Sequence, residues 1–282
     1  MVKRAISGVG LVIVLAAAIH FGIYFGFWPL RILVTALSLI ALREFFAVLL
    51  PHKPPVRWVV YAAVIYIGLR HYTLWVGFEI FVGLVFALLI MLVFFRKSVT
   101  AQDVTTALFG FFYIPFTLTF LVIIARMYGP ASVWLVFISA WGSDTFAYMI
   151  GKAFGRRKLC PALSPNKTVE GAVGGVIGAA FLGFLYGSFL LANQSLFFET
   201  NTEIAIALIC AFGAVLSQFG DLAASALKRQ AAAKDFGALI PGHGGVLDRF
   251  DSVLFAAPSI YFMLWWAEPH VIFPLVSTYW WF

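Results

Sequence analysis

The chain has little charge and few cysteines for its length. Only 11% of its 282 residues are charged and 63% are hydrophobic, whereas a soluble domain carries about 25% charged residues. This shortage excludes an ordinary water-soluble globular domain. The two cysteines, Cys160 and Cys210, are far apart in the sequence and lack metal-ligand spacing. We therefore expect neither a disulfide framework nor a cysteine-based metal site.

Long apolar runs fill the chain instead. They lie at about 5–27, 29–50, 56–71, 74–95, 106–126, 131–151, 170–192, 203–226 and 249–268. Most of them reach the ~20 residues that a helix needs to cross a bilayer, and they are continuous rather than alternating, which predicts helices. The third run is short, and the first continues to Trp28, which favours an uncleaved span over a signal peptide. The predicted fold is all-α, a polytopic integral membrane protein with about nine transmembrane helices.

The basic residues predict the orientation of these helices. The net charge is +7, and in such an apolar chain it indicates basic cytoplasmic loops rather than nucleic-acid binding. With a cytoplasmic N-terminus and every run crossing, only Arg70 and Arg126 fall in outer loops, while Arg31 and Arg43 lie within the second span. Without the third span, the basic loops before and after it would lie on opposite sides of the membrane. The positive-inside rule therefore favours the full count, with the C-terminus outside.

We expect one membrane domain over residues 1–282, because no repeat and no soluble segment is visible. Residues 1–128 would form N-terminal helices, residues 129–268 the catalytic helices and cytoplasmic loops, and residues 269–282 an interfacial tail rich in aromatic side chains. The seventh span repeats glycines at small-residue spacing, such as Gly171/Gly175 and Gly174/Gly178. This spacing allows close helix contact, either within the chain or in a homodimer.

Four aspartates lie in or beside the later spans. Asp144 is in the inner half of the sixth span, Asp221 in the inner half of the eighth, and Asp248 and Asp251 begin the ninth. Ionisable residues in such places are functional candidates because burying charge in hydrocarbon is costly. The predicted topology brings all four to the cytoplasmic side, beside the most basic loops. A proton or cation relay in a transporter is the alternative, but these acids do not lie at the midplane.

The stretch "LKRQAAAKDFGALIPGHGGVLDRFD", residues 227–251, joins two of these spans. Asp221, Ser225, Lys228 and Arg229 are spaced to share one helix face. The glycines near the middle of the stretch should break any helix and let backbone N–H groups approach a ligand. Carboxylates that can hold Mg²⁺ beside cations that can neutralise phosphate predict a site for phosphate chemistry. The simpler interpretation is a basic loop that binds lipid headgroups.

A second basic loop precedes the seventh span. It carries Ser164 and Lys167, and Thr168 with Glu170 can cap the helix that follows. A helix N-terminus beside Lys167 can hold phosphate. A plain cap with topology-setting charges explains the same residues equally well.

These stretches resemble the phosphatidate cytidylyltransferases, also called CDP-diglyceride synthases. The resemblance rests on the following positions: Ser225, Lys228, Arg229, Lys234, Asp235, Gly237, Pro241, His243, Gly244, Gly245, Asp248, Arg249, Phe250 and Asp251. The upstream "SDTFAYMIGKAFGRRKLCPALSPNKTVEG" and the "REFF" of residues 43–46 are also similar to the family. Phe146 is a departure, because a small residue is expected there. The first half of the chain matches only in its hydrophobic spans.

The resemblance implies that the chain converts CTP and phosphatidic acid into CDP-diacylglycerol and pyrophosphate, with one or two Mg²⁺ ions. CTP and the bilayer lipid would be its partners, without nucleic acid, in the inner (plasma) membrane with the site facing the cytoplasm. A phosphate nucleophile is already anionic, so the absence of a Ser–His or Cys–His pair is expected. Alternatives are a CTP-dependent kinase of a polyprenol or other lipid alcohol and an ion-coupled transporter.

The resemblance also implies roles for individual residues. The expected metal ligands are Asp221, Asp248, Asp144 and Asp251. The expected catalytic residues are Lys228, Arg229, Lys234, Asp248 and Arg249. The expected substrate-binding residues are Ser164, Lys167, Ser225, Asp235, Gly242, His243, Gly244 and Gly245. His243 could contact the nucleotide or brace the turn, and Glu44 could pair with Arg43 or reach the site.

Overall fold

The computed structural model describes residues 2–25, 27–52, 54–70, 74–191, 202–239 and 244–267. Every predicted apolar run is helical, and the chain is a polytopic membrane protein. The elements are α1 (Val2–Tyr24), α2 (Trp28–Leu49), α3 (Val56–Leu69), α4 (Leu74–Phe94), α5 (Ala101–Phe111), η1 (Phe112–Phe116), α6 (Thr117–Tyr128), η2 (Pro130–Ser132), α7 (Val133–Phe137), η3 (Ile138–Gly142), α8 (Ser143–Phe154), β1 (Lys158–Cys160), β2 (Ser164–Thr168), α9 (Val169–Tyr186), η4 (Gly187–Leu191), α10 (Thr202–Gln230) and α11 (Leu247–Ala267).

Within the described residues, 6 helical segments are long and apolar enough to cross a membrane. They are Trp28–Leu49, Ala101–Tyr128, Pro130–Phe154, Val169–Phe189, Thr202–Gln230 and Leu247–Ala267. Three shorter apolar stretches lie in α1, α3 and α4, and α3 has only 14 residues, as its short apolar run predicts. The full count of spans therefore stays a prediction, although the helix positions agree with it.

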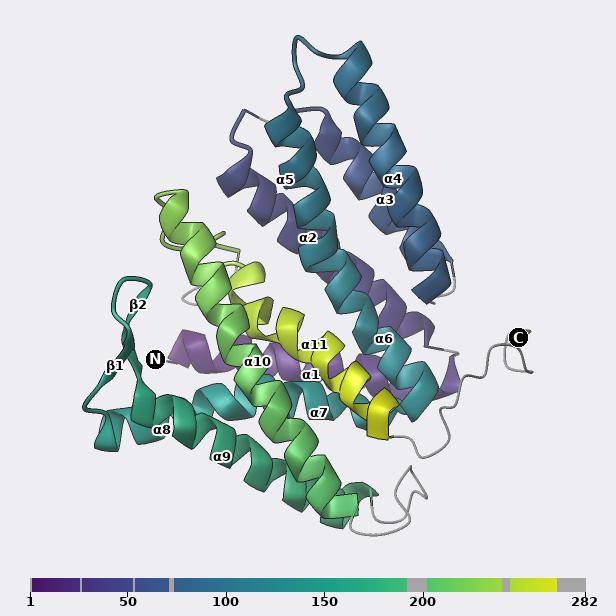
Figure 1. The fold of residues 1–282 in the computed structure, drawn as a ribbon. Helices are drawn as coiled ribbons and strands as arrows, with labels where there is room; N and C mark the ends of the chain where they lie inside the picture. The colour runs from purple at the N-terminus through teal and green to yellow at the C-terminus, as the bar shows by residue number, and fades with distance from the viewer. Residues whose placement is uncertain are drawn as a thin grey trace.

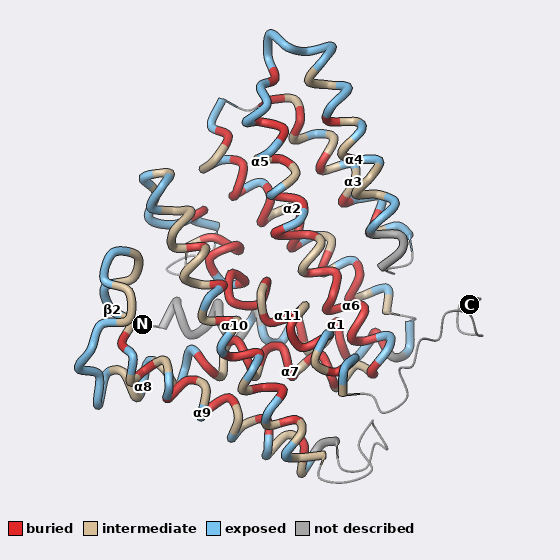
Figure 2. The backbone as a smooth tube through the Cα atoms, in the orientation of Figure 1, coloured by how far each residue is buried: buried red, intermediate tan, exposed pale blue. Residues whose placement is uncertain are grey.

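Helix α11 lies at the centre of the arrangement (Figure 1). It packs against α2 and α6 from the N-terminal part of the chain and against α7 and α10 from the later part. Buried residues concentrate along α2, α6 and α11 (Figure 2), where Phe45, Leu121 and Leu254 have no exposed surface. The boundaries of the predicted single domain and the interfacial tail at 269–282 are not tested, since the tail lies outside the described residues.

Two π-helical turns interrupt the long helices. η1 contains Pro115, which has no N–H to donate to an α-helical ladder. The wider turn accommodates this missing hydrogen bond, and the chain continues as α6. η3 ends at Gly142, directly before Ser143 and Asp144 at the start of α8. Such turns are frequent at functional sites because they alter the direction of the side chains that follow.

The glycines of α9 pack against α8 within the same chain. A Cβ on Gly178 would overlap the ring of Phe146, and one on Gly174 would overlap Ile150. A Cβ on Gly175 would lie 2.8 Å from the backbone oxygen of Ser143. The small-residue spacing therefore serves intramolecular contact here. Phe146, the departure from the family pattern, fills the space over Gly178.

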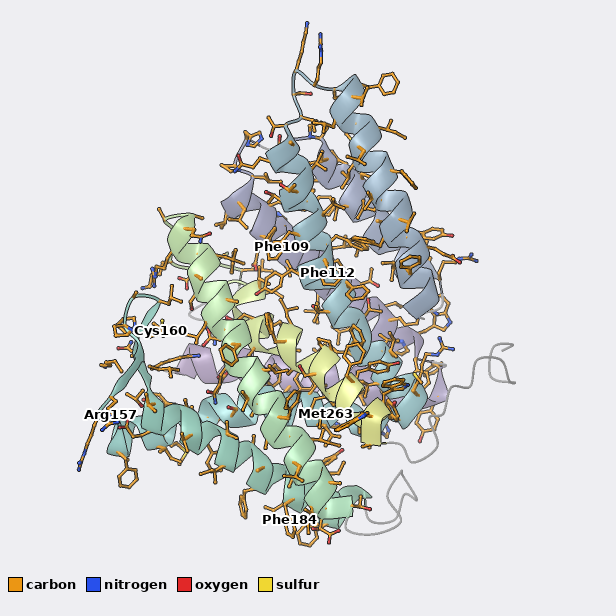
Figure 3. The ribbon with its side chains drawn as sticks, in the orientation of Figure 1. Phe109, Phe112, Arg157, Cys160, Phe184 and Met263 are labelled. Carbon is orange, nitrogen blue, oxygen red and sulfur yellow. The ribbon has the colours of Figure 1, made fainter. Side chains whose placement is uncertain are left out.

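A small antiparallel hairpin of β1 and β2 adds to the helical fold. Its base is fastened by Glu170, whose carboxylate accepts hydrogen bonds from the backbone N–H groups of Arg156 and Arg157 at 3.0 and 3.1 Å. The Thr168 hydroxyl accepts from the N–H of Gly171 at 3.1 Å, which confirms the predicted cap of α9. Arg157 and Cys160 lie on this hairpin side of the molecule (Figure 3).

The α8–α9 contact predicts that Gly178→Ala destabilises the protein by about 1–3 kcal/mol, because the added methyl overlaps Phe146. Combining it with Phe146→Ala should cost less than the sum of the two single changes. Gly83→Ala is the matched control, since nothing lies within 4 Å of its added Cβ. Thermal unfolding in detergent measures all four variants, and additive losses would contradict the packing argument.

Candidate active site at the polar end of the helix bundle

The hairpin, the C-terminal end of α10 and the N-terminal end of α11 lie at the same end of the molecule (Figure 1). The beginning of α1 lies on this side too, as the predicted topology requires. Asp144 of α8, Asp221 of α10 and Asp251 of α11 lie within electrostatic range of one another here. Three carboxylates from three helices therefore converge, although more than 100 positions separate Asp144 from Asp251 in the sequence.

Three cations accompany these carboxylates. Lys167 of β2 forms an ion pair with Asp221. Arg249 lies within electrostatic range of Asp144, and Lys228 within range of Asp251. Asp251 is buried, with its Oδ1 accepting from the N–H of Ser252 at 2.7 Å, whereas Asp144 is exposed. The Asp144 carboxylate nevertheless lies within hydrogen-bonding reach of the buried Ser252 side chain.

Asp248 organises the loop that precedes α11. Its Oδ1 lies 2.7 Å from Lys228 Nζ. Its Oδ2 accepts hydrogen bonds from the N–H groups of Phe236 at 2.9 Å and Gly245 at 3.0 Å. Both carboxylate oxygens are therefore engaged. Gly244, beside this carboxylate, adopts a φ of 82°, a conformation that glycine reaches without strain.

Glu44 of α2 reaches the same loop. Its carboxylate accepts from the N–H of Val246 at 3.0 Å and from that of Leu247 at 2.9 Å. Of the two alternatives left open by the sequence, the contact with the site region is the one that the structure shows. A side chain from the first half of the chain thus touches the start of α11.

The remaining predicted residues that the structure describes lie on β2, on α10 and in the loop after α10. Arg229, Lys234 and Asp235 are exposed. Ser164 and Ser225 are half-buried, on β2 and α10 respectively. Gly242 and His243 lie outside the described residues.

The fit of a metal ion can be judged from the donor set. Carboxylate oxygens are the ligands that Mg²⁺ prefers, and the mutual repulsion of Asp144, Asp221 and Asp251 would be relieved by a divalent cation. In the described part of the chain, however, no three His, Cys, Asp or Glu side chains stand close enough together to hold a metal, and Lys167 pairs with Asp221. Carboxylate oxygens therefore suit Mg²⁺, but Asp144, Asp221 and Asp251 must move closer together before they can bind one ion.

Tyr113 is a neighbour of the cluster that sequence reasoning did not identify. It lies on η1, within electrostatic range of Asp251 and Asp221. Its hydroxyl is buried and has no hydrogen-bond partner among the described residues. An aromatic residue in an apolar span carries no signal for such a position, because only the tertiary packing brings it there, with its ring centroid 6.5 Å from that of Phe255 on α11.

Comparison with known proteins shows the family of the chain. The model of the cytidylyltransferase family matches residues 2–267. The chain is 39% identical over 184 residues to a phosphatidate cytidylyltransferase of Bacillus subtilis, covering 64% of this chain and 66% of that protein. For the phosphatidate cytidylyltransferase of Thermotoga maritima the identity is 42% over 149 residues, 53% of this chain and 54% of that one.

A third relative, the phosphatidate cytidylyltransferase of Haemophilus influenzae, is 47% identical over 123 residues, 44% of this chain and 42% of that protein. The aligned regions therefore span between 42% and 66% of the lengths of these relatives. The family match covers nearly all described helices, from the first residues of α1 to the end of α11. The chain belongs to the cytidylyltransferase family.

Proposed function

We propose that this protein is a phosphatidate cytidylyltransferase that forms CDP-diacylglycerol and pyrophosphate from CTP and phosphatidic acid. The observation that carries the proposal is the convergence of Asp144, Asp221 and Asp251 with Lys167, Lys228 and Arg249 at one end of the bundle. The similarity to phosphatidate cytidylyltransferases from three bacteria supports it.

The reaction makes one bond and breaks one. A phosphate oxygen of phosphatidate attacks the α-phosphorus of CTP, and the bond from that phosphorus to the oxygen bridging the β-phosphate breaks. The nucleophile is anionic, so no general base is needed. The barrier comes from bringing two anions together and from charge on the departing pyrophosphate, which fixed cations reduce.

The basic residues divide into two groups by position. Lys228 and Arg249 lie within electrostatic range of Asp251 and Asp144, whereas Arg229 is at the exposed end of α10 and Lys234 is in the loop that follows. We assign the first two to the reacting phosphates and the second two to the outer part of the triphosphate. Lys167 would transfer from Asp221 to a substrate phosphate. Ser164, Ser225, Asp235 and the turn at 242–245 would complete the nucleotide site.

Asp144, Asp221 and Asp251 would hold one or two Mg²⁺ ions, and Asp248 has its oxygens engaged by Lys228 and the loop. Bound Mg²⁺ supplies positive charge that neutralises the triphosphate. The task of the protein is to hold these carboxylates on three helices so that they can approach one another without a large rearrangement. We therefore propose that Asp248 supports the loop and Lys228 and is not a metal ligand in this arrangement. It could contact a metal ion only if Lys228 moved away.

The lipid substrate explains why the site lies at helix ends. Phosphatidate presents its phosphate at the membrane surface, and CTP is a cytosolic nucleotide, so the site should face the cytoplasm of the inner (plasma) membrane. The bias of basic residues in the sequence supports this orientation.

Label transfer tests the reaction directly. Purified protein with phosphatidic acid, Mg²⁺ and CTP labelled in the α-phosphate should move label into the lipid, because the cytidylyl group is transferred. CTP labelled in the γ-phosphate should release labelled pyrophosphate and leave the lipid unlabelled. Transfer of γ-label to a lipid alcohol would show a kinase instead and would refute the proposal.

Asp248→Asn tests the support that Asp248 provides. Loss of its charge leaves Lys228 without its 2.7 Å partner and sets an amide against loop N–H groups. We expect turnover to fall on the order of 100-fold or more, with the variant still folded in detergent by circular dichroism. Glu79→Gln, on the exposed surface of α4, is the control and should keep normal turnover, and near-normal turnover by Asp248→Asn contradicts the role.

Metal binding can be followed without turnover. Mg²⁺ should raise the unfolding temperature of the wild-type protein, because a ligand that binds only the folded state stabilises it. Asp221→Asn and Asp251→Asn should each reduce that rise, since the ion loses a charged oxygen ligand, while Glu79→Gln should leave it unchanged. An equal rise in all variants would place the metal elsewhere.

A further inference from the structure

Glu44 caps a helix that belongs to a distant part of the sequence. The first N–H groups of a helix have no partner within it, and those of Val246 and Leu247 are taken by Glu44 at 3.0 and 2.9 Å. The pairs are separated by 202 and 203 residues. A carboxylate in this position is further stabilised by the partial positive charge of the helix N-terminus. The start of α11 is therefore determined by a side chain of α2.

The loop is shaped around this carboxylate. A Cβ on Gly237 would overlap Glu44 Oε1, and a Cβ on Gly245 would overlap Glu44 Oε2. Any other residue at either position would displace the carboxylate or the loop. Glu44 itself is only 8% exposed. The two glycines of the loop and the carboxylate thus form one packed unit.

Both oxygens of Glu44 are used by backbone groups, so the residue acts through the loop. Asp248 binds the N–H groups of Phe236 and Gly245 from the other side. The two carboxylates together bind Phe236, which precedes the undescribed residues 240–243 of the connection from α10 to α11, and residues 245–247, which follow them. Moving the start of α11 would move Asp248 and Arg249, which stand on its first turn.

We propose that Glu44 is a positioning residue for CTP, which sets the loop before α11 and the first turn of α11 in the geometry that binds the triphosphate. The inference rests on the function proposed above. Glu44→Gln keeps the shape of the side chain but places an NH₂ group against one of the two N–H groups. It should raise the KM for CTP about tenfold or more and change kcat less.

Asp103→Asn is the matched control. Asp103 is also a buried carboxylate that caps a helix, accepting from the N–H of Thr100 at 2.8 Å, and it pairs with His52, but it lies at the start of α5. The same change from carboxylate to amide should lower stability there and leave the KM for CTP at the wild-type value. If Glu44 served only stability, Glu44→Gln would behave as Asp103→Asn does, with less active protein and an unchanged KM.

A second variant tests the mechanism without removing the charge. Gly237→Ala should displace the Glu44 carboxylate and raise the KM for CTP in the same way. In a Glu44→Ala background the added methyl meets no carboxylate, so Gly237→Ala should have little further effect. Independent effects of the two changes would overturn the proposed coupling.

Hydrogen exchange separates this inference from the proposed function. The amides of Val246 and Leu247 should exchange faster in Glu44→Gln than in the wild type, whether or not CTP is turned over. A wild-type protein that makes no CDP-lipid would refute the function and leave this contact testable. With an active wild type, a wild-type KM for CTP in Glu44→Gln would refute the role of Glu44 in binding CTP, whatever the exchange rates, and wild-type exchange would show that the two N–H groups do not depend on the carboxylate.

Discussion

The geometry of the site follows from how the backbone N–H groups at the start of α11 find hydrogen-bond acceptors. Four N–H groups at residues 236, 245, 246 and 247 point toward two carboxylates, those of Glu44 and Asp248. Unpaired N–H groups are costly where water is scarce, and two neighbouring carboxylates repel each other unless donors surround them. The carboxylates pair the N–H groups, and the N–H groups reduce the repulsion between the carboxylates. The arrangement fixes α11 relative to α2 and α10, and α11 carries Asp248 and Asp251.

A second group of charged residues, the aspartates and cations of the site, lies beside this loop. Asp144, Asp221 and Asp251 come from three helices, and Lys167, Lys228 and Arg249 lie within electrostatic range of them. Such a cluster would be a poor choice for stability alone, since apolar residues would fill the space at less cost. Its charge pattern suits a site that receives a polyphosphate and a cation together.

Helix packing brings this cluster together. The glycines of α9 let α8 approach until Phe146 lies over Gly178 and Ser143 lies beside Gly175. Gln218 of α10 donates hydrogen bonds to Ser143 at 3.1 Å and to the backbone of Ala172 at 3.0 Å. The three helices α8, α9 and α10 are thereby joined, and Asp144 and Asp221 are placed near each other.

Composition and spacing alone predicted the class of fold, the helix positions and the list of charged candidates. Hydrocarbon imposes long apolar helices, and exposed charge in such a chain is confined to loops and sites, so composition and spacing were sufficient for these inferences. Even the cap at Thr168 could be predicted from neighbouring residues, because capping is local. The hairpin of β1 and β2 was not predicted, since its strands are short and carry no alternating pattern.

Which of these candidates lie close together depends on how the helices pack. Glu44 could have paired with Arg43 or reached the loop, and the choice depends on how α2 packs against α11. The glycines of α9 could have served a dimer, and the fit of Phe146 over Gly178 showed that α8 uses them. Nothing in the sequence indicated that Tyr113 lies near the carboxylate cluster. Contacts between residues 20 to 200 positions apart depend on helix orientation, which is set by the packing of whole helices and not by any local pattern.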